Sequence, residues 1–116
     1  MMAEIDGSKM EAAASAAAKS AVEEMGRLVL ENARIWAAYH MWNHRAFVDG
    51  LIFDPDDEFL VANSHQWAED MEPRCGWKRA SWDAAGGQSK MNEMMGNALS
   101  SKDLIDSLLD VIGGIF

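Results

Sequence analysis

The sequence predicts an all-α fold, and three of its features indicate this. Long stretches are rich in alanine, leucine and glutamate, apolar residues recur at helical spacing, and capping residues or glycines mark the expected ends. No stretch has the regular apolar–polar alternation of a half-buried strand. At 116 residues, the chain is expected to form one helical domain over 1–116.

The dominant predicted element is a long amphipathic helix over residues 8–49. Ser8 and Glu11 fit a capping box at its start, and Gly50 follows it where a left-handed residue commonly ends a helix. At 1.5 Å per residue, such a helix is about 60 Å long, roughly twice the diameter of a small domain. We therefore expect the helix either to break near Gly26 or to reach beyond its own domain.

The apolar arc of this helix is wider than the stripe of about 100° that a surface helix needs to cover a core. The surplus predicts contacts with other chains. The polar residues Asn32, Tyr39, His40, Asn43 and His44 interrupt the arc. Buried polar groups at such positions can fix helix register and oligomeric state, and partial exposure is the alternative.

A second helix is predicted over residues 55–71. Asp54 suits the N-cap, and Pro55 suits the first helical position. Residues 72–87 are expected to be irregular, because Pro73 and several glycines interrupt the periodicity. Two short C-terminal helices complete the prediction, at about 88–99 and 101–112.

The two ends of the chain carry separate expectations. Residues 1–7 are predicted to be an irregular lead. Residues 100–116 are either core or an amphipathic docking tail, and we favour the tail because so small a chain already has a surplus of apolar helix surface.

Charge and composition exclude several classes of protein. The formal net charge of −9 disfavours binding to nucleic acid or to an anionic membrane. The single cysteine, Cys75, excludes an internal disulfide and is typical of a reducing compartment. No apolar run reaches the roughly 18 residues of a membrane span. We expect a cytoplasmic protein, or one assembled inside a host cell into a particle.

The charges are also unevenly distributed along the chain. Residues 51–72 hold seven acids and no base, whereas residues 73–90 have a net charge of +3. Blocks of opposite sign can pair within one chain or between copies. In the segment 74–82, the bases Arg74, Lys78 and Arg79 are interleaved with Trp77 and Trp82. This segment is read as a protein contact, as core or, least favoured, as a nucleic-acid stacking surface.

His40 and His44 form the sharpest chemical motif. Two histidines four residues apart share a helix face and can chelate one metal ion, with His65 and Cys75 as further ligands. The alternative is that both histidines are packed and hydrogen-bonded. No glutamate completes the metalloprotease pattern H-E-x-x-H, and no cofactor is predicted.

The predicted function is a non-enzymatic structural or assembly subunit, or an adaptor. It packs into a larger complex, a homo-oligomer or a virion or phage component. The first alternative is an acidic inhibitor that mimics nucleic acid through the acids of residues 54–72, and the second is a small metal-binding protein using His40 and His44. The predicted interface residues are Asn32, Trp36, Tyr39, Asn43, Arg74, Trp77, Trp82, Leu104, Leu108 and Phe116.

Overall fold

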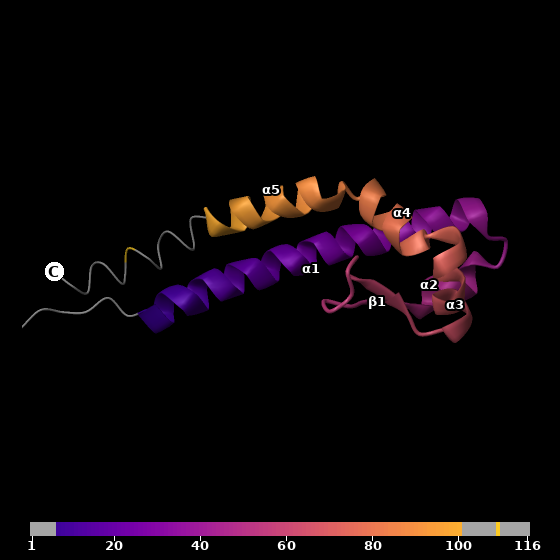
Figure 1. Ribbon diagram of the computed structural model, residues 1–116, viewed down its shortest axis with the longest axis horizontal. Coiled ribbons are helices and arrows are strands. Elements are labelled where there is room, and N and C mark those ends of the chain that lie inside the picture. Colours follow the sequence, from indigo (N-terminus) through magenta and orange to yellow (C-terminus); the bar gives the residue numbers. More distant parts are fainter. Residues whose placement is uncertain (1–6, 101–108, 110–116) are drawn as a thin grey trace, which may run out of the picture.

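A computed structural model describes residues 7–100 and 109, with side chains from Ala14 onward, and confirms the all-α class. Figure 1 shows α5 running back alongside α1, while the other elements gather around the C-terminal part of α1. The helices are α1 (Gly7–His40), α2 (His44–Gly50), α3 (Gln66–Cys75), α4 (Trp77–Ala84) and α5 (Gly87–Leu99).

The fold also contains a small antiparallel sheet that the sequence analysis did not predict. Strand β1 (Leu51–Phe53) pairs with β2 (Val61–Asn63), so that Leu51 lies opposite Asn63 and Phe53 opposite Val61. Val61 is fully buried, and β1 and β2 both contact α1. The sheet therefore covers part of the apolar arc of α1.

Helix α1 differs from the predicted 8–49 helix in where it stops. It continues through Gly26, where a break was expected, and ends at His40. Residues 41–43 form a turn before α2, whose Phe47 is fully buried and meets the Trp77 ring edge-on at 4.9 Å between ring centroids. Burying this ring favours the turn over a continued helix, because tertiary packing overrides helix propensity.

Gly50 does not adopt the left-handed conformation that was expected. It is the last residue of α2, and the described residues with positive φ are Leu60 and three other glycines. A Cβ at Gly50 would overlap the side chain of Asn63. The glycine is therefore explained by close packing between α2 and β2.

The core follows a four-residue spacing along α1. Met25, Val29, Ala33 and Ala37 are all fully buried. They are enclosed by several elements of the same chain, since α1 contacts α2, α4, α5 and the sheet. Most of the wide apolar arc is thus covered without a second molecule.

The helix predicted over 55–71 begins only at Gln66, because the aspartates before it fold their own backbone into turns. Asp54 Oδ1 accepts a hydrogen bond from the Asp56 N–H, and Asp57 Oδ1 accepts one from the Phe59 N–H. Such local bonds compete with a helix. The turns connect β1 to β2.

Residues 72–87, predicted to be irregular, are mostly helical. Pro73 lies inside α3, and Gly76 ends that helix in the left-handed conformation with φ of 62°. Helix α4 follows directly and buries Trp77 and Trp82. The helix predicted over 101–112, apart from the helical and exposed Leu109, lies outside the described residues, as do the side chains of the Ser8 capping box.

Candidate protein-interaction surface

Lys78 joins the two charge blocks within one chain. Its Nζ lies 2.6 Å from Glu69 Oε2 and 3.3 Å from Asp57 Oδ2, and its backbone N–H donates to the Glu72 carboxylate. The lysine side chain is only 12% exposed. Burial lowers the pKa of Lys78, but the hydrogen bonds and charges of Glu69 and Asp57 outweigh it and raise the pKa above its ordinary value.

This arrangement bears on the nucleic-acid mimic. Asp57, Glu69 and Glu72 face Lys78, and Glu69 also accepts a hydrogen bond from the Asn63 N–H. These acids of the 54–72 segment are engaged in internal contacts, which counts against their forming one continuous negative face for a basic target.

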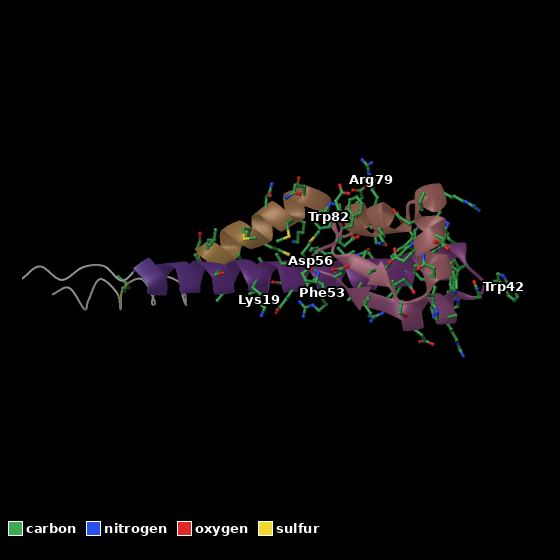
Figure 2. The ribbon with its side chains drawn as sticks, turned by 60° about the horizontal axis from the view of Figure 1, so that its bottom comes forward. Lys19, Trp42, Phe53, Asp56, Arg79 and Trp82 are labelled. Atoms are coloured by element: carbon green, nitrogen blue, oxygen red, sulfur yellow. The ribbon has the colours of Figure 1, made fainter. Side chains whose placement is uncertain are left out.

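The end of the molecule formed by residues 34–45, here called the tip, exposes large apolar side chains. Ile35 is 49% exposed, Tyr39 84% and Trp42 97%. Figure 2 shows Trp42 pointing outward at the far end of the molecule. Tryptophan and tyrosine exposed to this extent are unusual on a monomer surface and are typical of contact sites.

A set of packed rings connects the tip to the core. Trp36 stacks on His40 with ring centroids 4.8 Å apart and lies 5.9 Å from Phe47. Trp67 is stacked on His65 and also packs near Phe47. Phe47 therefore links Trp36 and Trp67 to the buried Trp77, so that the rings beside the tip are part of the packed core.

The tip carries cations and no acid. Arg34 and Arg45 give residues 34–45 a net charge of +2 with neutral histidines, in a chain whose net charge is −9. Both arginines are exposed, and neither forms an ion pair with any described side chain. Aromatic residues beside arginine, with acids absent, match the composition of protein-binding hot spots.

The predicted metal site is not built as the sequence suggested. His40 ends α1 and His44 begins α2, so the turn between them removes the i,i+4 helical geometry. His40 stacks on Trp36, and His65 stacks on Trp67. Among the described residues, no three histidine, cysteine or acidic side chains form a group that could hold a metal ion.

The predicted interface residues do not form one surface. Trp36, Tyr39 and Asn43 lie together at the tip, while Asn32 donates to the Leu28 carbonyl within α1. Arg74 is exposed on α3.

Trp77 and Trp82, predicted as interface residues, are instead core residues. The Trp77 indole N–H donates to the Ala68 carbonyl, and Trp82 packs near Phe59. Leu104, Leu108 and Phe116 lie outside the described residues.

Sequence reasoning included Tyr39 among the interface residues but missed Ile35 and Trp42. In a continuous helix over 8–49, Ile35 belongs to the apolar arc, and Trp42 lies between His40 and His44 of the metal motif. The available signal was the W-N pair at 42–43, since asparagine favours turns over helix interiors. A turn there projects Trp42 away from the body.

Comparisons with known proteins do not assign this chain to a family. Scans against protein-family models, curated proteins and solved structures found no match. Within the described part of the chain, no helix combines the length and apolar character of a membrane span.

Proposed function

We propose that this chain is a non-enzymatic structural or assembly subunit, or an adaptor, that binds other protein subunits through the tip. The observation that carries the proposal is the exposure of Ile35, Tyr39 and Trp42 together at one end. Burial of such side chains at an interface is favourable, and tryptophan and tyrosine are enriched among the residues that dominate binding energy. A component of a homo-oligomer, a virion or a phage is one form of this function.

The internal packing limits the surfaces through which the chain can associate with other subunits. The sequence suggested that the surplus of the apolar arc of the long helix would contact other chains, but α2, α4, α5 and the sheet cover most of the arc. The support for association therefore rests on the tip. We further propose that the subunit acts in the cytoplasm or inside a host cell, in keeping with its single unpaired cysteine.

The test is the mass in solution, measured by light scattering over a concentration series. We expect the mass of the wild type to rise with concentration. The variant Tyr39→Ser/Trp42→Ser should associate at least about thirtyfold more weakly, since losing one such hot spot costs about 2 kcal/mol or more.

Leu99→Ser is the matched control. Leu99 is also exposed, but it ends α5, at the opposite end from the tip. It should associate as the wild type does. A wild type that stays monomeric over the whole series contradicts the proposed function, and equal effects of both variants contradict the role of the tip.

A further inference from the structure

A second surface of this chain complements the tip in charge. The segment 54–58, in the connection between β1 and β2, is here called the acidic loop. It holds Asp54, Asp56, Asp57 and Glu58 and no base, a net charge of −4.

Part of the acidic loop is used internally, and part of it is available. Asp54 bonds the backbone of the loop, and Asp57 pairs with Lys78. Asp56 and Glu58 are exposed and form no ion pair with any side chain that the structure describes. The loop therefore presents two unpaired carboxylates, which equals the number of unpaired guanidinium groups at the tip.

The acidic loop also has apolar neighbours. Ile52, on β1, is 48% exposed, and Pro55 lies exposed between the acids. An aromatic side chain from the tip can pack on these residues while the arginines meet the carboxylates. Charged groups arranged around an apolar centre are the usual anatomy of a protein interface.

The loop and the tip of one molecule do not meet each other. Figure 2 shows Asp56 near the middle of the long axis and Trp42 at its end. Any contact between the two surfaces is therefore a contact between different molecules.

We propose that the tip of one copy binds the acidic loop of a second copy, with Arg34 and Arg45 facing Asp56 and Glu58. This inference rests on the proposed assembly function and names the surface that the tip binds. Because the two surfaces differ, the contact is heterologous, and repeating it joins copies into an open chain or a ring.

The test uses two variants with reversed charges. Arg34→Glu/Arg45→Glu sets acids of the tip against the acidic loop, and Asp56→Lys/Glu58→Lys sets bases of the loop against the tip. Each variant alone should associate about tenfold or more weakly than the wild type in low salt, because attraction is replaced by repulsion.

Mixing the two variants gives the decisive measurement. In the mixture, the reversed tip meets the reversed loop, and the native tip of one variant meets the native loop of the other. We expect an equimolar mixture to regain association close to that of the wild type, measured as mass by light scattering or sedimentation. Added salt should weaken both the wild type and the mixture.

Lys19→Glu/Arg27→Glu is the matched control for the tip variant. It makes the same change in net charge as Arg34→Glu/Arg45→Glu, at exposed positions of α1 outside the tip. It should associate as the wild type does. If the wild type associates but the charge variants do not weaken it, or the mixture fails to regain association, the tip–loop contact is wrong and the assembly function stands. A monomeric wild type overturns both.

Discussion

At the scale of single residues, Lys78 connects three parts of the fold. It brings together the acidic loop, α3 and α4 through Asp57, Glu69 and its own position after Gly76. Its ammonium group also lies 5.6 Å from the centroid of the Trp77 ring. Replacing it leaves two carboxylates close together without a cation, which is costly for partly buried groups.

The first prediction concerns Lys78→Met and pH. The variant should lower the free energy of unfolding by about 2 kcal/mol at pH 7. Because the folded pKa of Lys78 is raised above its ordinary value of 10.5, its stabilisation is complete below that pH and is lost as pH rises through the folded pKa. Urea unfolding at several pH values should show the wild type losing stability above about pH 10.5, and the variant losing less.

Arg79→Met is the control for this prediction. Arg79 is exposed, and its Nε lies 3.9 Å from Asp83 Oδ2. Exposed pairs contribute little, so the change should stay within about 0.5 kcal/mol. Equal losses for both variants would show that Lys78 is no more than an ordinary surface lysine.

At the scale of the elements, Gly26 explains how the sheet docks on α1. A Cβ at this buried glycine would overlap the ring of Phe53 on β1. The absence of a side chain thus allows the strand to approach the helix closely. An interior glycine was the reason to expect a break in the helix, but here it serves packing.

The second prediction compares two glycine substitutions in helices. Gly26→Ala should lower the free energy of unfolding by about 1–3 kcal/mol, because overpacking exceeds the gain in helix propensity. Gly96→Ala, in α5, meets nothing within 4 Å and should instead raise it by about 0.5–1 kcal/mol. Thermal or urea unfolding measures both, and a stabilised Gly26→Ala would refute the close approach of the sheet.

The sequence predicted some elements well because their signals are local. Helix α5 was expected at 88–99 and spans Gly87–Leu99. The acidic loop misled the prediction because an aspartate before proline fits a helix cap and an Asx turn equally well. The choice between them is made by the burial of Val61, which no local pattern reports.

The tip was predicted in part for a similar reason. Trp36, Tyr39 and Asn43 were selected as polar or aromatic members of an apolar arc. Which side chains are exposed depends on where α1 stops, and that is decided by Phe47 packing on Trp77. Trp42 therefore could not be singled out from periodicity alone.

At the scale of the whole molecule, burial along α1 is graded. Every fourth residue from Met25 to Ala37 is fully buried, whereas none of residues 14–20 is. Backbone hydrogen bonds open more readily where few side chains are packed over them. The stability of this one helix should therefore rise from its start towards the tip.

The third prediction follows from this gradient. In hydrogen exchange, amides of residues 25–37 should exchange at least about tenfold more slowly than those of residues 14–20. Mass spectrometry of peptides from the exchanged protein measures the difference. Uniform protection along α1 would mean that other contacts cover its N-terminal part in solution.

Because α1 and α5 run in opposite directions, the two ends of the molecule differ. Helix α1 starts and α5 finishes towards one end, while Trp42 lies at the other (Figures 1 and 2). At 1.5 Å per residue, α1 alone is about 50 Å long. If one copy were attached to a surface through either of those helix ends, the exposed aromatic side chains of its tip would point away from that surface. A layer of copies attached in this way would present many identical binding sites on its outer side.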